Sequence, residues 1–453
     1  MSLFSFLDRD RTVAKPGYSR WLVPPAALAI HLAIGQVYAF SVFKIPLSQL
    51  IGLSKPGAED WKQSQIAWIF SLAILMLGLS AALFGKWLES AGPRKAMFAS
   101  AICFALGFFI SSLGVHWHRL WIIFFGYGVV GGTGLGLGYI SPVSTLIKWF
   151  PDRPGLATGL AIMGFGGGAM IGSPLAILLM SHFRTATHLG VGRTFLVMGA
   201  AYFVFMMFGV FTIRVPQEDW KPEGWTPSAK GSAFITTHNV DVNTAFRTPQ
   251  FWLLWIVLCT NVTAGIGILE QASPMIQDLF KGSIGAVAAG GFVGLLSLFN
   301  MGGRFFWSSV SDFIGRKATY FIFFVAGSIL YFLLPRTGGD HLNSVPLFVG
   351  ICAVLLTMYG GGFATIPAYL RDMFGTHHVS AIHGRLLTAW SVAGVLGPVL
   401  VNHTREYQLE HGADKAGAYQ TVLHILAGLL IVGFVANLLV RPVAEKYWMK
   451  PAK

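Results

Sequence analysis

The sequence predicts an all-α membrane protein with about twelve transmembrane helices, arranged as two pseudo-repeated bundles of six. Three observations support this prediction: the composition, the recurrence of long apolar runs, and a loop sequence that occurs twice. Of the 453 residues, 54% are hydrophobic and only 11% are charged, and the mean hydropathy is +0.62. Soluble domains carry about 25% charged residues. The chain is therefore predicted to fold in a bilayer rather than around a water-soluble core.

The apolar runs recur along the whole chain, and a helix of about 20 residues is enough to cross a bilayer. The longest polar stretch follows the sixth run and is rich in Pro, Gly, Lys and Glu, as expected of a linker between two halves. The predicted spans are residues 21–43, 64–85, 96–115, 120–146, 156–180, 194–213, 251–274, 284–310, 318–334, 345–370, 380–401 and 418–440. The predicted divisions are an N-terminal tail (1–20), a first bundle (21–214), a central linker (215–250), a second bundle (251–441) and a C-terminal tail (442–453).

The net charge of +13 could indicate a nucleic-acid partner. The basic residues lie instead in short loops between the apolar runs, where they set the orientation of membrane helices. The side opposite the N-terminus has about half as many basic residues, so the positive-inside rule predicts that both termini are cytoplasmic. We therefore expect a multi-pass protein of the plasma (inner) membrane, with the lipid bilayer and not nucleic acid as its partner.

Metal, redox and enzyme chemistry find little support in the sequence. The three cysteines lie in three different apolar runs, and no C-x-x-C occurs. The paired histidines at 116/118 and 377/378 lack the acidic or thiol companions of a metal site. The spans contain no H-E-x-x-H and no G-x-S-x-G. We expect neither a metal nor a cofactor, and no enzymatic activity.

Two related loops follow the second and the eighth predicted span. In each copy an acid precedes a glycine by three residues, and basic residues follow. The glycine permits a tight turn, the acid can cap a helix N-terminus or pair with an arginine, and the basic residues hold the loop at the cytoplasmic surface. We expect these residues to form a cytoplasmic gate, although their charges could serve only to set topology. They are Gly85, Glu89, Gly92, Arg94 and Lys95 in the first copy, and Asp312, Gly315 and Arg316 in the second.

Two glycine-rich runs, 131–138 and 164–172, resemble nucleotide-binding loops only in composition. No strand pattern precedes them and no Gly-Lys-Ser/Thr follows, which excludes a phosphate-binding loop. Small residues let membrane helices approach closely, so we expect these runs to pack the fourth span against the fifth.

Arg304 is the most informative single residue, because it lies inside the eighth apolar run with no acid within a turn of it. An arginine inside a membrane helix costs roughly 2.5–3.5 kcal/mol, so it is retained where it faces protein, water or a partner. Its planar guanidinium can bind a carboxylate through two parallel hydrogen bonds. Asn300, one turn earlier on the same face, could orient it or accept a substrate hydroxyl. A structural pairing of Arg304 with another helix is the alternative.

Other polar and aromatic residues in the spans are weaker candidates. Gln36 and Tyr38 in the first span could line a substrate cavity or be satisfied core residues. Tyr359 and Phe363, one turn apart in the tenth span, could form an aromatic wall or simply pack. Glu270, late in the seventh span, could carry a proton if buried, or could be an interfacial carboxylate in water.

The repeated loop resembles the signature of the major facilitator superfamily, G-x-x-x-[DE]-x-x-G-x-R-[KR]. Residues 85–95 fit this pattern, and the second copy has Ser308 in place of its first glycine. The twelve spans, the central linker and the cytoplasmic termini agree with the resemblance, which covers nearly the whole chain. The resemblance implies the major facilitator fold, a monomeric carrier and transport by alternating access.

Within that superfamily the chain resembles the oxalate/formate antiporter family, which is related to monocarboxylate transporters. The resemblance rests on residues 148–155 (Lys-Trp-Phe-Pro-Asp-Arg-Pro-Gly), 247–252 (Arg-Thr-Pro-Gln-Phe-Trp) and 303–307 (Gly-Arg-Phe-Phe-Trp). It implies that Arg304, which matches the arginine of the family's eighth helix, binds the substrate carboxylate. It also implies that Tyr139 matches an aromatic residue of the substrate cavity.

One departure from the family bears on the substrate. The oxalate carrier has a lysine in its eleventh helix where alignment of Gly384 and Gly397 places Trp390. With one cation instead of two, we expect a small monocarboxylate of the lactate, pyruvate or formate type, moved by anion exchange (antiport) or with a proton (symport). The alternatives are an oxalate:formate antiporter and a carrier of a different substrate class, such as a drug or a sugar.

Overall fold

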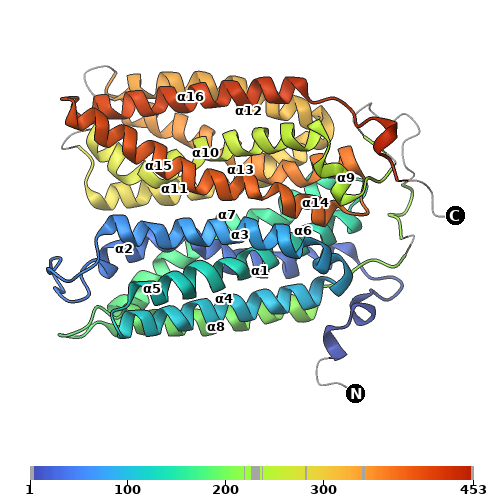
Figure 1. Ribbon diagram of the computed structural model, residues 1–453, viewed down its shortest axis with the longest axis horizontal. Coiled ribbons are helices and arrows are strands. Elements are labelled where there is room, and N and C mark those ends of the chain that lie inside the picture. The colour runs from blue at the N-terminus through green and yellow to red at the C-terminus, as the bar shows by residue number, and fades with distance from the viewer. Residues whose placement is uncertain are drawn as a thin grey trace. The chain divides into compact units, whose positions relative to one another are not determined.

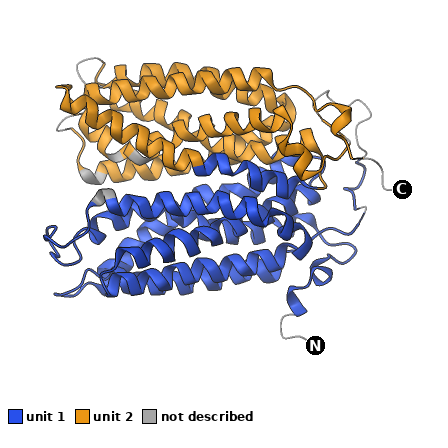
Figure 2. Ribbon diagram, viewed as in Figure 1, with its two compact units in different colours: residues 1–228, 378–391 blue, residues 229–377, 392–453 orange. Residues whose placement is uncertain are grey.

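The computed structural model describes residues 5–218, 220–225, 235–236, 238–280, 283–338 and 342–449. These residues form helices and loops without a β-strand, and Val13 and Val215 make one isolated parallel bridge. The chain divides into two compact units, which Figure 2 shows in different colours. Unit 1 is Met1–Ser228 with His378–Ser391, and unit 2 is Ala229–His377 with Val392–Lys453. The segment 378–391 therefore packs with the first half of the chain.

Unit 1 contains the first six predicted spans (Figure 1). Its helices are α1 (Pro24–Ile34), α2 (Ser41–Leu47), α3 (Gln63–Ala91), α4 (Pro93–His116), α5 (Leu120–Ile123), α6 (Gly132–Trp149), α7 (Pro154–Phe183), α8 (Val191–Thr212) and α14 (Val379–Leu386). The 3-10 helices η1 (Ser5–Leu7), η2 (Arg9–Thr12), η3 (Arg20–Leu22) and η4 (Gly35–Phe40) and the π-helical segment η5 (Phe124–Gly131) complete it.

Unit 2 contains the remaining spans. Its helices are α9 (Val242–Phe246), α10 (Pro249–Leu279), α11 (Ala286–Ile314), α12 (Arg316–Leu333), α13 (Val345–Phe374), most of α15 (Thr388–Glu410), and α16 (Lys415–Leu439). Two short 3-10 helices, η6 (Leu334–Thr337) and η7 (Glu445–Tyr447), follow α12 and α16.

The same neighbours recur in the two units. The second and fourth spans lie side by side in unit 1 (α3 and α6), and the eighth and tenth do so in unit 2 (α11 and α13). The third span contacts the sixth (α4 and α8), and the ninth contacts the twelfth (α12 and α16), as Figure 1 shows. The predicted two-bundle pseudo-repeat of an all-α membrane fold is thereby confirmed.

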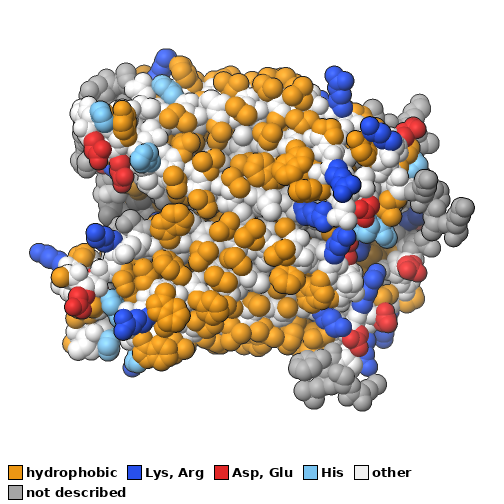
Figure 3. Space-filling model, viewed as in Figure 1, with side chains coloured by type: hydrophobic (Ala, Val, Ile, Leu, Met, Phe, Trp, Pro, Cys, Tyr) orange, Lys and Arg blue, Asp and Glu red, His pale blue; other side chains and the backbone are white. Residues whose placement is uncertain are grey.

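Eleven segments in the described part of the chain are long and apolar enough to cross a membrane. They match all the predicted spans except the eighth. At that position lies α11, 29 residues long, which carries Arg304 and Asp312. On the face shown in Figure 3, hydrophobic side chains cover the middle of the helices, and charged side chains gather near the helix ends. This surface suits a lipid environment.

Three predicted spans are not single α-helices, and the fourth passes from α5 through the π-helical η5 into α6. In the first, α1 gives way to the 3-10 helix η4 at Gly35. A Cβ added to Gly35 would lie 2.4 Å from the carbonyl oxygen of Phe165, so α7 approaches the backbone closely at this break. In the eleventh, α14 ends before Leu387 and α15 begins after it. The Leu387 carbonyl oxygen lies 2.5 Å from the Cβ position of Gly78 in α3, so a backbone contact again accompanies the break.

The glycine runs pack helices closely, as predicted, but the predicted partners are wrong. A Cβ on Gly134 would lie 2.7 Å from a backbone nitrogen of α4, and one on Gly136 would lie 2.3 Å from a carbonyl oxygen of α3. A Cβ on Gly168 would lie 2.4 Å from the backbone where α1 ends. The glycines of the fourth span thus face α3 and α4 and those of the fifth face α1, rather than one another.

The two repeated loops adopt the same backbone conformation. Gly92 has φ +85° and ψ 163°, and Gly315 has φ +86° and ψ 151°. Residues with a Cβ rarely adopt this positive φ, so both turns require glycine. Each glycine connects two membrane helices with a single residue, α3 to α4 and α11 to α12.

Candidate functional site

Arg304 is fully buried in α11 and is held by neighbours on two helices. Its Nε donates a hydrogen bond to Oδ1 of Asn300, one turn earlier, at 3.1 Å. Its guanidinium carbon lies 5.2 Å from the ring centroid of Phe363 in α13. The rings of Phe363 and Tyr359 meet edge to face at 5.4 Å. Four residues predicted from the sequence are therefore together in unit 2, and we call them the arginine cluster: Asn300, Arg304, Tyr359 and Phe363.

Glycines bring α11 and α13 into contact at this cluster. A Cβ on Gly360 would lie 2.2 Å from the carbonyl oxygen of Asn300, and one on Gly303 would lie 2.3 Å from that of Thr357. Trp307 adds a hydrogen bond from its indole nitrogen to the Thr357 hydroxyl at 3.1 Å. Small residues at both crossing points let the backbones touch. The face of α11 with Asn300 and Arg304 thereby packs against the face of α13 with Tyr359 and Phe363.

The chemistry of the arginine cluster suits an anion. A guanidinium over an aromatic face gains about 0.5–2 kcal/mol of cation–π attraction, which fixes its plane without neutralising its charge. The amide oxygen of Asn300 accepts a hydrogen bond from Arg304, and this bond orients the guanidinium. A positive charge of fixed orientation is what binding of a planar carboxylate requires.

Unit 1 holds a second group, which we call the aromatic cluster and which includes the predicted residues Tyr139 and Trp390. Its other members are His31, Phe165 and His383. All five side chains are buried. The Tyr139 ring lies 5.5 Å from Trp390, 5.6 Å from Phe165, 5.4 Å from His31 and 5.8 Å from His383. Phe165 and Trp390 are 5.2 Å apart. Tyr139 and Trp390, which the family resemblance singled out separately, are therefore direct neighbours.

The remaining binding candidates differ in position. Tyr38 joins the edge of the aromatic cluster, with its ring 5.1 Å from that of Phe165. Gln36 is buried elsewhere in unit 1 and accepts a hydrogen bond from the Tyr127 hydroxyl at 3.1 Å. Glu270 lies within α10, but its side chain is outside the part that the structure describes.

In the first repeated loop, Glu89 caps a helix. Its Oε1 accepts the backbone N–H of Ala381, the third residue of α14, at 3.1 Å, and its Oε2 lies 3.1 Å from Nδ1 of His378. A carboxylate at this position satisfies an otherwise unbonded N–H and interacts favourably with the helix dipole. Gly85 allows the contact, because a Cβ there would lie 2.9 Å from the Cα of Ala381.

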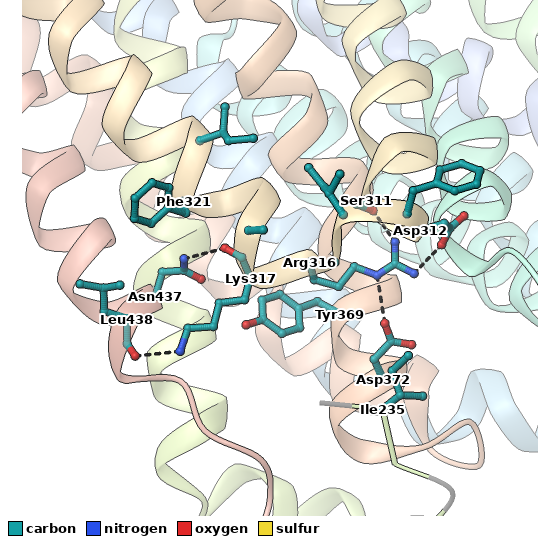
Figure 4. Close-up of a pocket in the computed structure, with 15 residues that line it drawn as sticks. Ile235, Ser311, Asp312, Arg316, Lys317, Phe321, Tyr369, Asp372, Asn437 and Leu438 are labelled. Carbon is teal, nitrogen blue, oxygen red and sulfur yellow. Dashed lines mark hydrogen bonds and ion pairs between the residues drawn. The ribbon is translucent and has the colours of Figure 1, made fainter. Parts of the chain in front are cut away.

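In the second repeated loop, Arg316 bridges two carboxylates. It bonds Asp312 at 2.6 Å and Asp372 of α13 at 3.0 Å, and it also donates to the Ser311 hydroxyl (Figure 4). Asp372 in turn pairs with Arg371 at 3.0 Å. These groups line part of a pocket of about 760 Å³ beside the α11–α12 turn. The second loop therefore ties together helices of unit 2.

The first position of the repeated loop is Gly85 in the first copy and Ser308 in the second, and the surroundings of the two residues differ. Where Gly85 makes room for α14, Ser308 is buried and donates a hydrogen bond to the carbonyl oxygen of Arg304, one turn earlier, at 2.5 Å. A bond of this kind satisfies the serine within its own helix.

A basic residue two positions after each turn glycine caps the end of a later helix, α8 in unit 1 and α16 in unit 2. Arg94 donates to the carbonyl oxygen of Ile213 after α8, at 3.4 Å, and to that of Phe6, at 2.7 Å. Lys317 donates to the carbonyl oxygens of Leu438 and Val440 at the end of α16, at 2.9 and 2.8 Å. Cations at helix C-termini satisfy the last carbonyl groups. Lys95 differs, since it pairs at the surface with Asp8 at 3.3 Å.

Among the residues of these contacts that sequence reasoning did not select are Asp372, His378 and His383. Asp372 directly follows Arg371 near the C-terminal end of α13, and His378 belongs to a histidine pair that was considered only as a metal site. His383 is a polar residue in an apolar run, as Gln36 is in the first span. Their partners are more than 50 residues away in the sequence, so only the tertiary structure could pair them.

The sequence and the fold are similar to those of known transporters. Residues 19–398 match the Major Facilitator Superfamily. The oxalate:formate antiporter of Oxalobacter formigenes is 26% identical over 381 residues, which are 84% of this chain and 83% of that protein. Monocarboxylate transporter 11 of Homo sapiens is 24% identical over 430 residues, 91% of this chain and 80% of that protein. The structure of the proton:xylose symporter XylE superposes with a TM-score of 0.69 at 12% identity, covering 93% of this chain and 96% of that one.

Proposed function

Since the chain belongs to the Major Facilitator Superfamily and is a multi-pass membrane transporter rather than an enzyme, we propose that it carries small monocarboxylates of the lactate, pyruvate or formate type. The observation that carries this proposal is the arginine cluster. Arg304 is a buried cation in α11, the helix at the position of the eighth predicted span, and it is oriented by an amide and an aromatic ring. Such a charge is expensive in a membrane and is retained where it serves an anion or another partner.

We infer the charge of the substrate from the number of cationic side chains at the proposed binding positions. A dianion in a low-dielectric site requires two compensating charges, because a buried unpaired charge costs several kcal/mol. The family resemblance places Trp390 at the position of the oxalate carrier's lysine, and the Trp390 indole is packed in the aromatic cluster. A monocarboxylate is neutralised by Arg304 alone. Oxalate:formate exchange, the activity named for the relative from Oxalobacter formigenes, is the second candidate.

Transport is proposed to follow alternating access, with Arg304 reached from one side of the membrane at a time. Glu270 is a proposed proton site. Besides Arg304, the proposed substrate-contacting residues are Asn300, Tyr359, Phe363, Tyr139, Trp390, Gln36 and Tyr38. The proposed cytoplasmic gate is the Glu89 cap on α14 with the two turn loops. The location in the plasma (inner) membrane, the cytoplasmic termini, the monomeric state and the counter-anion or proton are part of the same proposal.

Uptake into liposomes by the purified protein tests the proposed substrate class. The panel is labelled formate, acetate, lactate, pyruvate, glycolate and oxalate, with xylose as a neutral control and protein-free liposomes to correct for leakage. Each acid is assayed with and without a pH gradient and an internal counter-acid, which separates symport from exchange. We expect saturable uptake of one or more monocarboxylates. Transport of xylose but of no acid would refute the proposal.

A further inference from the structure

The pocket beside the α11–α12 turn lies within unit 2 and has no part in the proposed binding of the carboxylate. Its volume of about 760 Å³ is within the range of ligand pockets, about 300–1,000 Å³. Tyr369 of α13 and Asn437 of α16 line it, and both are fully buried. Among the described residues, neither the Tyr369 hydroxyl nor Oδ1 of Asn437 has a hydrogen-bond partner. Such atoms are rare in native proteins, so this pair points to a ligand that hydrogen-bonds them.

The two buried atoms differ in the hydrogen bonds that they can make. Nδ2 of Asn437 donates to the carbonyl oxygen of Lys317 at 3.0 Å, which fixes the orientation of the amide and leaves Oδ1 as an acceptor. The Tyr369 hydroxyl can donate or accept. In Figure 4 this hydroxyl points toward the side of the pocket where Lys317 and Asn437 lie. A fitting ligand therefore offers a donor, such as a hydroxyl, to Asn437 and a second polar group to Tyr369.

Basic residues make this side of the pocket suitable for an anion. The ammonium group of Lys317 lies at the C-terminal end of α16, where it donates to two carbonyl oxygens. Arg441, two residues beyond that end, is exposed and acts on Lys317 electrostatically. Because like charges repel each other, an anion near both of them is stabilised. The two acids that line the pocket, Asp312 and Asp372, are both bonded to Arg316. Each acid therefore already has a cation beside it.

Exposed apolar side chains surround the polar part of the pocket. Phe313, at the end of α11, is 82% exposed, and Ile314, Phe321 and Leu438 are exposed as well. All four line the pocket. The pocket lies where α11 and α16 end and α12 begins, and charged side chains gather near the helix ends beside the hydrophobic surface (Figure 3). A pocket with a polar interior and an apolar rim at a membrane surface suits an amphiphile.

We propose that this pocket binds the headgroup of an anionic phospholipid that carries hydroxyl groups, such as phosphatidylglycerol. The lipid phosphate lies beside Lys317 and Arg441 and accepts the hydrogen of the Tyr369 hydroxyl. A headgroup hydroxyl donates to Oδ1 of Asn437. The acyl chains cover the exposed apolar rim, which free phosphate would leave in water. Basic pockets between membrane helices are known sites for anionic headgroups. This inference holds whichever substrate the protein carries.

Lipid titration of the purified full-length protein in a non-ionic detergent tests this inference. Native mass spectrometry measures the affinity for phosphatidylglycerol and for phosphatidylcholine with the same acyl chains. We expect phosphatidylglycerol to bind about tenfold more tightly or better, because each of two basic residues contributes roughly 1 kcal/mol toward an anionic lipid. Arg441→Gln should lower this preference about fivefold. Arg336→Gln removes an exposed arginine of η6 outside the pocket and should keep the preference of the wild type.

Tyr369→Phe distinguishes a lipid-binding hydroxyl from a structural one. The hydroxyl has no partner among the described residues, so its removal should leave the unfolding temperature without added lipid at or above that of the wild type. The affinity for phosphatidylglycerol should nevertheless fall about tenfold, since a hydrogen bond to a charged group is lost. Tyr407→Phe, which removes the hydroxyl of an exposed tyrosine of α15, is the matched control and should change neither quantity.

The outcomes that would overturn the proposal are distinct. Equal affinity for the two lipids would exclude a headgroup site. Inorganic phosphate that raises the unfolding temperature as much as phosphatidylglycerol would assign the pocket to a free anion. A lower unfolding temperature of Tyr369→Phe without lipid would show that the hydroxyl stabilises the fold instead. If Tyr369→Phe aggregates in size-exclusion chromatography, Arg441→Gln decides, because wild-type lipid preference in that variant would also overturn the site.

Discussion

If the cap that Glu89 forms on α14 holds the proposed gate closed, then Glu89→Ala and Glu89→Gln should open the gate to different extents. Removing an N-cap side chain costs about 0.5–2 kcal/mol, and the charge alone contributes about 0.3–1 kcal/mol at a helix N-terminus. Glu89→Ala removes the bond to the Ala381 N–H and the contact with His378. Glu89→Gln removes only the charge. If this contact is made in one state of the gate and not in the other, the two variants shift the opening equilibrium by these free energies.

The magnitude follows from these free energies. Since 1.4 kcal/mol is a factor of ten, Glu89→Ala should raise the open fraction about two- to thirtyfold and Glu89→Gln about two- to fivefold. A cysteine in place of Ser380, which is buried beside Ala381, reports opening through its rate of maleimide labelling. Rapid opening makes that rate proportional to the open fraction.

The assay uses purified protein in detergent, so that the orientation in a membrane does not matter. Glu59→Gln, an exposed acid outside the gate, is the matched control and should label like the parent. The expected order of labelling rates is Glu89→Ala, then Glu89→Gln, then the parent with its control. Equal rates in all four proteins would refute the gate and leave Glu89 with a role in topology only.

Three further predictions concern the second repeated loop, the α11–α13 contact and the charge of the substrate. Asp312→Asn removes one of the two carboxylates bonded to Arg316, so it should destabilise the protein by about 1.5–3 kcal/mol; an unchanged thermal unfolding temperature would contradict this. Gly360→Ala places a Cβ 2.2 Å from the carbonyl oxygen of Asn300, so it should lower transport and thermal stability together, and wild-type values of both would show that the helices separate at little cost. Trp390→Lys should shift competition between oxalate and lactate toward oxalate by about tenfold or more, since each factor of ten needs about 1.4 kcal/mol; wild-type protein that already prefers oxalate would contradict the inference from Trp390.

The positions of the helices could be predicted because a bilayer imposes a length and a polarity on every span. The arginine cluster was also accessible, since Asn300 and Arg304 are one turn apart in one helix, as are Tyr359 and Phe363 in another. The breaks at Gly35 and Leu387 were missed. Each break occurs where another helix contacts the backbone. The residues around a break do not indicate which distant helix makes this contact.

The same limit applies to the polar partners. Glu89 was expected either to cap a helix or to pair with an arginine, and the choice depended on α14, almost 300 positions later in the chain. The aromatic cluster draws residues from α1, α6, α7, α14 and α15. Family resemblance pointed to Tyr139 and Trp390 individually. Their contact with each other and with His383 is a property of the tertiary structure.

The central claim is that Arg304 anchors a carboxylate, and transport by variants at this position tests it most directly. Lysine keeps the charge but cannot reproduce the planar two-bond geometry, and alanine removes both. A charge-assisted hydrogen bond contributes about 1.5–3 kcal/mol, so both variants should lose about tenfold or more of lactate or pyruvate uptake in liposomes. Arg336→Lys, an exposed arginine of η6 in the same unit, should transport at the wild-type rate. Wild-type uptake by folded Arg304→Lys or Arg304→Ala protein would contradict the claim.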